Sequence, residues 1–259
     1  MRQVLVNWRC FIQPQKGVLD APKKHSLIQV YNFEDLPLIA MNVARIGAQT
    51  PGMASEIAGT EKHLVVIGFG PVTWMLITPD KPVPGGFRAF DETEINGEDV
   101  PETEGDILLY FSSDRADLNS AIAGQVRELF GKDGELMEEI EAEGFMQSNA
   151  DNNLAEQILI DNSINLDTEK SSFVFTQRFS GEEEVLSRLY QNSFSCDNKR
   201  FTLTYSNDPS ELEDHGESVS RSPVSRGTFF LPSLDLLTSL RMGGIRMGSL
   251  AINARWKGH

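Results

Sequence analysis

Three groups of polar side chains in the second half of this chain could take part in chemistry. Residues 144–153 read GFMQSNADNN, where the neutral amide of Gln147 can donate and accept hydrogen bonds but cannot take up a proton. His215 stands in the acidic stretch ELEDHGES, and such neighbours favour a solvated imidazole. Arg221 and Arg226 flank Ser-Pro-Val-Ser, and a guanidinium fixed in a dry site can stabilise developing negative charge. The surrounding elements decide whether these groups can meet.

A strand and an amphipathic helix precede these residues. The apolar, β-favouring run 107–111 is bounded by Gly105 and Ser112, which predicts a buried strand. After it, Asp114 or Asp117 can cap a helix that ends near Gly131, where a left-handed stop is expected. The apolar positions of this helix recur every three to four residues: Leu118, Ile122, Val126, Leu129 and Phe130. The acidic segment GKDGELMEEIEAEG that follows predicts a further helix with an exposed charged face.

Alternating strands and helices predict two similar α+β halves. The first half contains the strands LIQVYNF, HLVVIGFG and DILLYF, with helices in DLPLIAMNVARIGA and VTWMLI. The second contains the strands FVFTQRF, FTLTYSN and GTFFLP, with helices in EEEVLSRLYQNSF and LDLLTSLRM. We therefore expect an N-terminal half over 1–135, a C-terminal half over 136–240 and a basic tail over 241–259, with the linker near 131–145.

Several of these segments resemble the dye-decolourising (DyP-type) haem peroxidases. The unit 105–131, followed by Gly144 and Phe145, resembles a strand, a helix and a Gly-Phe segment of that family. GVLDAPKKHSLIQVYNF, VVIGFGPVTW, FVFTQRF and SPVSRGTFFLPSLDLL resemble further family segments, in the family's order. The resemblance covers most of 17–240 and implies two ferredoxin-like halves of the dimeric α+β barrel type, with antiparallel sheets covered by helices.

The resemblance also implies haem-dependent, H₂O₂-driven oxidation of an organic reductant. The family uses a distal Asp within Gly-x-x-Asp-Gly, a distal Arg and a proximal His that ligates the iron. In the matching segment, Gln147 stands where the family has its Asp, and Ser148 stands where it has the second Gly. Gln147 can therefore orient peroxide but cannot deprotonate it.

The other two roles fall on residues between 215 and 226. The family's proximal His lies in a context that aligns with ESVSR, which places Ser218 at the ligand position and leaves His215 as the candidate for the haem iron. Either Arg221 or Arg226 corresponds to the distal Arg, which stabilises charge as the peroxide bond breaks. The chain is also shorter than the family usually runs, and the shortage falls around this site.

Two functions stay open. The first is a peroxidase in which Gln147, Arg221 or Arg226, and His215 serve around a haem. The second is a haem-free, non-catalytic binding or assembly protein on the same fold, which the replacements at Gln147, Ser148 and Ser218 favour.

Composition excludes several other classes. The 259 residues carry a net charge of −15, which disfavours binding to nucleic acid or to an anionic membrane surface. No apolar stretch is long enough to cross a bilayer, and the N-terminus lacks the pattern of a secretion signal. Cys10 and Cys196 form no Cys-x-x-Cys spacing, so we expect free thiols, no zinc site and a cytoplasmic protein.

The last nineteen residues, RMGGIRMGSLAINARWKGH, are basic and contain no acid. Their Gly-Ser-Leu wording resembles the cargo peptides by which some dye-decolourising peroxidases enter encapsulin shells, and spaced apolar anchors can bind a groove on a partner. The alternative is a final helical turn and a frayed end that packs on the same chain. The family resemblance further implies a homo-oligomer.

Overall fold

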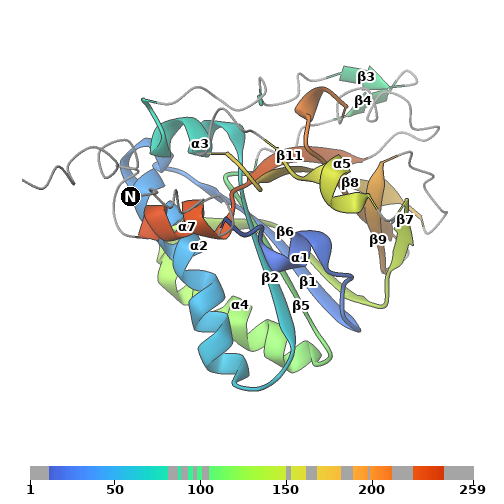
Figure 1. Ribbon diagram of the computed structural model, residues 1–259, viewed down its shortest axis with the longest axis horizontal. Helices are drawn as coiled ribbons and strands as arrows, with labels where there is room; N and C mark the ends of the chain where they lie inside the picture. The colour runs from blue at the N-terminus through green and yellow to red at the C-terminus, as the bar shows by residue number, and fades with distance from the viewer. Residues whose placement is uncertain are drawn as a thin grey trace, which may run out of the picture.

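A nine-stranded sheet in the order β6-β1-β5-β2-β11-β8-β10-β9-β7 forms the centre of the protein (Figure 1). The computed structural model describes residues 12–80, 87–88, 93–95, 98–100, 105–149, 153–161, 168–181, 189–197, 199–211 and 224–241. The strands of the sheet are β1 (His25–Phe33), β2 (His63–Phe69), β5 (Ile107–Ser113), β6 (Gly134–Glu143), β7 (Met146–Ser148), β8 (Ser172–Ser180), β9 (Tyr190–Cys196), β10 (Lys199–Ser206) and β11 (Ser225–Leu231).

Short and long helices cover the sheet, and a small hairpin stands apart from it. The helices are α1 (Lys16–Leu19), α2 (Leu36–Ala58), α3 (Pro71–Ile77), α4 (Ala116–Phe130), the short 3₁₀ turn η3 (Gly131–Asp133), α5 (Leu154–Ile158) and α7 (Leu234–Arg241). The hairpin consists of β3 (Thr93–Ile95) and β4 (Glu98–Val100). Among the described helices, none combines the length and the apolar character that a membrane span requires.

The sheet consists of two ferredoxin-like units with the same strand order. The first unit has the order β6-β1-β5-β2. If its strands are counted along the chain, this order is fourth, first, third and second. The second unit, β11-β8-β10-β9, repeats this order, with β7 added at its edge. The units join where Phe69 of β2 pairs with Phe230 of β11. The predicted α+β fold with two ferredoxin-like halves is confirmed.

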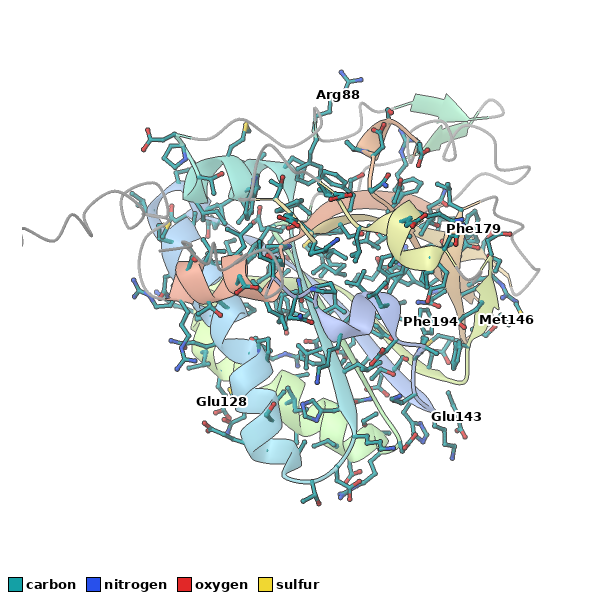
Figure 2. All side chains as sticks on the ribbon, viewed as in Figure 1. Arg88, Glu128, Glu143, Met146, Phe179 and Phe194 are labelled. Carbon is teal, nitrogen blue, oxygen red and sulfur yellow. The ribbon has the colours of Figure 1, made fainter. Side chains whose placement is uncertain are left out.

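The two faces of the sheet bury different cores. The outer core lies under α2, α3, α4 and α7 and extends from the first half to Phe173, Phe175 and Phe230 of the second. The inner core combines residues of both halves, such as Val30 of β1 and Phe194 of β9, which is labelled in Figure 2. Because neighbouring residues along a strand point to opposite faces, membership in one core identifies the face of each position.

An ion pair crosses the inner core. Arg178 of β8 places Nη1 3.1 Å from Oε1 of Glu138 on β6. The edge strand of the first half is thereby linked to a central strand of the second, and the two halves form one body around a shared interior.

One helix expected from the sequence is a strand, and so is the end of a second. The acidic segment after Gly131 forms β6, in which Glu138, Ile140 and Ala142 are buried and the residues between them are exposed. This period of two, together with pairing along β1, decides the conformation, whereas the charge pattern alone favoured a helix. The end of EEEVLSRLYQNSF likewise forms β9, and residues 182–188 lie outside the described residues.

The helix α4 lies where the sequence placed it, and only its N-terminus differs. Neither Asp114 nor Asp117 caps it; Arg115 is the N-cap residue and gives no side-chain cap. Gly131 has φ of 63° at the C-terminus, which confirms the predicted left-handed stop.

Candidate functional site

A row of polar residues crosses the second half of the sheet. Arg226 on β11 pairs with Gln177 on β8, and Gln177 pairs with Thr202 on β10. Thr202 in turn pairs with Ser193 on β9, which pairs with Met146 on β7. Directly opposed residues in antiparallel strands point to the same face, so the row lies on one face of the sheet.

This face is the outer one. Phe230 belongs to the outer core and stands four residues from Arg226 on β11, an even spacing that keeps both on one face. A second row lies on the same face, displaced from the first by two residues along each strand. It consists of Thr228, Phe175, Thr204, Gln191 and Ser148. The outer face of the second half therefore carries Phe173, Phe175 and Phe230 at one end and mainly polar residues, with Phe179 among them, at the other. We call its polar part the Arg226 face.

Several polar atoms on the Arg226 face are buried without a hydrogen-bond partner in the described chain. Gln177 is 0% exposed, and neither its Nε2 nor its Oε1 has a partner. The buried hydroxyls of Thr202 and Thr228 are in the same condition, as is Ser148 Oγ. A buried polar group without a partner costs about 1–3 kcal/mol. Each of these groups therefore requires a hydrogen-bond partner that the described residues do not supply.

The charge on this face is positive. Arg226 is 2% exposed, and Arg200 is also buried and donates from Nη1 to Ser193 Oγ at 3.0 Å. Within the described strands β7 to β11, no position that points to this face holds Asp, Glu or His. Glu211 reaches the face only through Ser206 Oγ, four residues or about 13 Å along β10 from Thr202. The face can therefore bind an anion or a polar group, but it lacks a carboxylate beside Arg226.

The site residues predicted from the sequence do not come together among the residues that the structure describes. Gln147 lies opposite Asn192 on β9 and donates to Asn192 Oδ1 at 3.1 Å and to Tyr190 Oη at 2.9 Å. Tyr190 belongs to the inner core, so Gln147 and Arg226 point to opposite faces of the sheet. His215, Ser218 and Arg221 lie outside the described residues.

The sequence did not predict Gln177, Thr202 and Thr228 as site residues. The segment FTLTYS contained one indication of a polar face, because Thr202, Thr204 and Ser206 alternate with apolar residues there. Such alternation predicts one polar face, but it is ordinarily the pattern of a solvated face. Only the structure shows that these polar residues are buried.

Comparisons with known proteins agree with this architecture. The model of the N-terminal domain of Dyp-type peroxidases matches residues 36–146. A haem complex of a DypB variant from Rhodococcus jostii aligns with a TM-score of 0.72 and 18% identity, over 88% of this chain and 98% of that chain. The encapsulated DyP-type peroxidase from Mycobacterium smegmatis aligns with a TM-score of 0.70 and 15% identity, over 87% and 97%.

A third solved structure, the dye-decolorizing peroxidase from Bacteroides thetaiotaomicron, has a TM-score of 0.67 and 15% identity over 89% of this chain and 99% of that chain. A comparison with curated proteins found no match. The family model covers the first half, and the solved structures extend the same fold over the second. Residues 36–146 therefore match the N-terminal domain of Dyp-type peroxidases, and the whole described chain shares the fold of the solved Dyp-type structures.

The Arg226 face meets part of what a haem requires. An aromatic end next to a polar, positively charged end suits a group with an apolar ring and anionic edges. Unpartnered Gln177, Thr202 and Thr228 supply hydrogen-bonding groups. The described histidines, His25 and His63, begin β1 and β2 in the first half, so any iron ligand must come from elsewhere.

Proposed function

We propose that the protein binds haem against the Arg226 face and catalyses H₂O₂-driven oxidation of an organic reductant, at a rate limited by the lack of a carboxylate beside Arg226. The observation that supports this most is the buried, unpartnered amide of Gln177, which lies directly opposite Arg226. The match of residues 36–146 to the Dyp-type peroxidase model supports the reaction class, and the similar structures that are haem complexes support the cofactor.

Each residue of the proposed site has a defined task. Haem would supply the redox chemistry. Arg226, held in a dry environment, would stabilise negative charge on the peroxide as its oxygen–oxygen bond breaks. The amide of Gln177 and the hydroxyl of Thr202 would orient the peroxide by hydrogen bonds. His215 is the proposed iron ligand, and Arg221 remains the alternative distal arginine.

Proton transfer is the weak step in this site. A carboxylate can take the proton from one peroxide oxygen and deliver it to the other, and this contribution amounts to about 10²–10⁴-fold in rate. An amide can do neither, whether it is Gln177 on this face or Gln147 on the other. We therefore expect slow turnover and a rate that depends on water or buffer as the proton carrier.

Two variants distinguish the position that the structure favours for a catalytic acid from the position that the family alignment assigns to it. Gln177→Glu places a carboxylate opposite Arg226, where the guanidinium keeps it ionised, and should raise peroxidase turnover by about tenfold or more. Gln147→Glu places the same group at the position that the family alignment assigns to the acid. If only Gln147→Glu accelerates the haem-loaded protein, the site lies around Gln147 and the proposal for the Arg226 face is wrong.

The second candidate is a haem-free binding or assembly protein on the same fold. The observation that favours it is the lack of Asp, Glu and His on the Arg226 face within the described strands. In that case the unpartnered amide and hydroxyls would bind a different polar ligand. An inability to bind haem, together with intact folding, would support this second function.

The C-terminal tail and the oligomeric state add two further proposals. One similar structure is an encapsulated DyP-type peroxidase, and the tail 241–259 resembles cargo peptides, so we propose that this chain can be loaded into an encapsulin shell. Co-expression with a shell protein tests it: the full chain should co-sediment with shells, and a chain that ends at residue 240 should not. Analytical ultracentrifugation tests the proposed homo-oligomer.

A further inference from the structure

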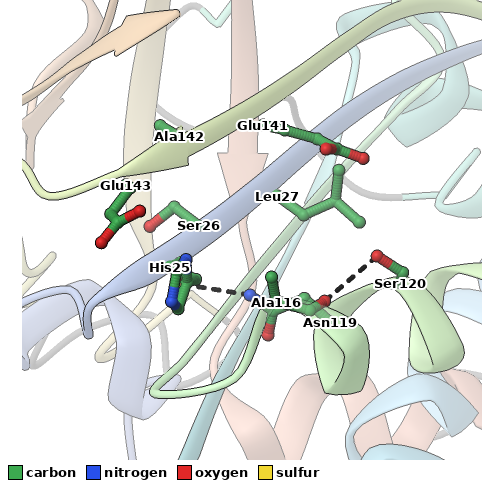
Figure 3. A pocket seen from close by; sticks show the side chains of 9 residues that line it. All are labelled: His25, Ser26, Leu27, Ala116, Asn119, Ser120, Glu141, Ala142 and Glu143. Atoms are coloured by element: carbon green, nitrogen blue, oxygen red, sulfur yellow. Dashed lines mark hydrogen bonds between the residues drawn. The ribbon is translucent and has the colours of Figure 1, made fainter.

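A polar cavity lies in the first half, away from the Arg226 face. It has a volume of about 290 Å³ and opens between the start of β1, the first turns of α4 and the end of β6 (Figure 3). Its wall consists of His25, Ser26, Leu27, Ala116, Asn119, Ser120, Glu141, Ala142 and Glu143. The volume suits a small ligand.

Asn119 presents a buried acceptor in the wall of this cavity. The side chain is 2% exposed, and its Nδ2 donates to the backbone oxygen of His25 at 3.0 Å. Because a carbonyl oxygen only accepts, this bond fixes which end of the amide is nitrogen. Asn119 Oδ1 is left buried without a partner in the described chain.

The acids on the outer face of β6 also include one without a partner. Glu139 accepts hydrogen bonds from Gln29 Nε2 at 2.5 Å and Arg127 Nη2 at 3.0 Å, and Glu143 lies 3.0 Å from Lys24 Nζ. Glu141 stands between these two acids on the same face, and it forms no ion pair with any residue of the described chain. Glu141 and Glu143 both line the cavity, and Glu141 is the one of the two without an ion-pair partner among the described residues.

Ser120 adds a further hydrogen-bond acceptor to the wall of the cavity. Ser120 donates its proton to the backbone oxygen of Ala116 at 3.1 Å, so its lone pairs face outward as acceptors. Leu27 and Ala116 give an apolar lining for a short aliphatic chain. Among the residues that the structure describes, no group of three or more His, Cys, Asp and Glu side chains could hold a metal ion.

We propose that this cavity binds a small organic cation with several N–H donors, an alkylguanidinium or a polyamine. One charged head would lie between Glu141 and Asn119 Oδ1, with the aliphatic chain along Leu27 and Ala116. The site does not depend on haem, and its acceptors come from α4 and β6, so the ligand would bridge helix and sheet. The peptide dipoles at the start of α4 oppose a cation, but the full negative charge of Glu141 outweighs that partial charge.

Agmatine, which carries a guanidinium and an ammonium on a four-carbon chain, is the probe. Isothermal titration of the full-length protein at low ionic strength should show one site per chain, and neutral butylurea should not bind. Glu141→Gln should weaken agmatine binding by about tenfold, as expected for the loss of a charge-assisted hydrogen bond. Ala116→Phe retains every charge but fills the cavity, and it should abolish binding.

The matched control is Glu135→Gln, which makes the same change of charge on the same strand outside the cavity. It should bind agmatine as the unmodified protein does. If Glu135→Gln and Glu141→Gln weaken binding equally, or if Ala116→Phe leaves it intact, agmatine is attracted only by the overall negative charge and the proposed site is wrong.

Discussion

Gln177 and Arg226 are directly opposed residues on the neighbouring strands β8 and β11, and both are buried on the outer face of the second half. The Cα atoms of such a pair lie about 5 Å apart, so an amide and a guanidinium share one small space. Neither polar atom of the amide has a hydrogen-bond partner in the described chain. This arrangement is costly for the free protein and is explained if a ligand completes it.

The free protein should therefore become more stable when Gln177 is replaced by Leu. The substitution removes two unpartnered polar atoms at similar volume, and we expect a gain of about 1 kcal/mol in the free energy of unfolding. Haem affinity should fall in the same variant. Urea denaturation of the haem-free protein and a haem titration measure the two effects.

Gln29→Leu is the matched control for this experiment. Gln29 is equally buried, but its Nε2 donates to Glu139 and its Oε1 accepts from Tyr31 Oη. Its replacement should destabilise the protein, because it leaves the Tyr31 hydroxyl without this acceptor. If both leucine variants lose stability to the same extent, the amide of Gln177 is satisfied in solution and the ligand argument fails.

The ion pair inside the sheet makes a prediction about pH. Burial raises the pKa of Glu138 above its ordinary value of 4.5, and the attraction of Arg178 opposes this shift only in part. Because the pKa is higher in the folded state than in the unfolded state, protonated Glu138 contributes to stability. This contribution is fully present below the ordinary pKa and is lost as pH rises through the folded-state pKa. Glu138→Gln should remove this loss, so its stability relative to the unmodified protein should improve with pH across that window.

Removing the partner should have the opposite effect. Arg178→Met leaves the Glu138 carboxylate buried without its cation, and we expect a loss of about 2 kcal/mol at neutral pH that shrinks as the solution is acidified. Lys24→Met breaks an exposed ion pair and should change stability little. Chemical denaturation at several pH values measures both, and a loss for Arg178→Met that is independent of pH would contradict the account.

All four tyrosines should resist ionisation in the folded protein. Burial raises the pKa of Tyr110 to about 12, and it also raises the pKa values of Tyr31, Tyr190 and Tyr205. The corresponding stability is present below pH 10 and is lost as pH rises through the folded-state values. Absorbance at 295 nm should therefore rise together with the loss of circular dichroism; a rise near pH 10 in folded protein would show that these phenols are accessible.

The sequence predicted the elements of the fold more reliably than the site. Strong apolar runs such as 107–111, and the glycine stop at Gly131, led to correct elements because local preference and packing agree there. The acidic segment 134–143 was assigned the wrong conformation because its charges hid a period of two that pairing with β1 reinforces. Gln147 was singled out by alignment alone, which carries no information about the face to which a strand residue points.

The residues of the Arg226 face could not have been found in this way. Thr202 and Ser193 lie on a hairpin formed by β9 and β10, but Gln177 of β8 and Arg226 of β11 join them only through the strand order of the second half. Their burial depends on tertiary packing, which no local pattern records. Arg226 was the only residue of the row that the sequence indicated as a candidate site residue, because of its charge and its context.

A haem titration followed by visible absorbance tests the central claim most directly, with the unmodified protein compared with Thr202→Val and Thr176→Val. Thr202 Oγ1 is buried without a partner on the Arg226 face, whereas Thr176 stands on the opposite face and donates to the backbone oxygen of Gly227. The account predicts a Soret band that saturates near one haem per chain, is weakened or shifted in Thr202→Val and is unchanged in Thr176→Val. No Soret band in the folded protein, or a band that neither substitution alters, would contradict haem binding at the Arg226 face.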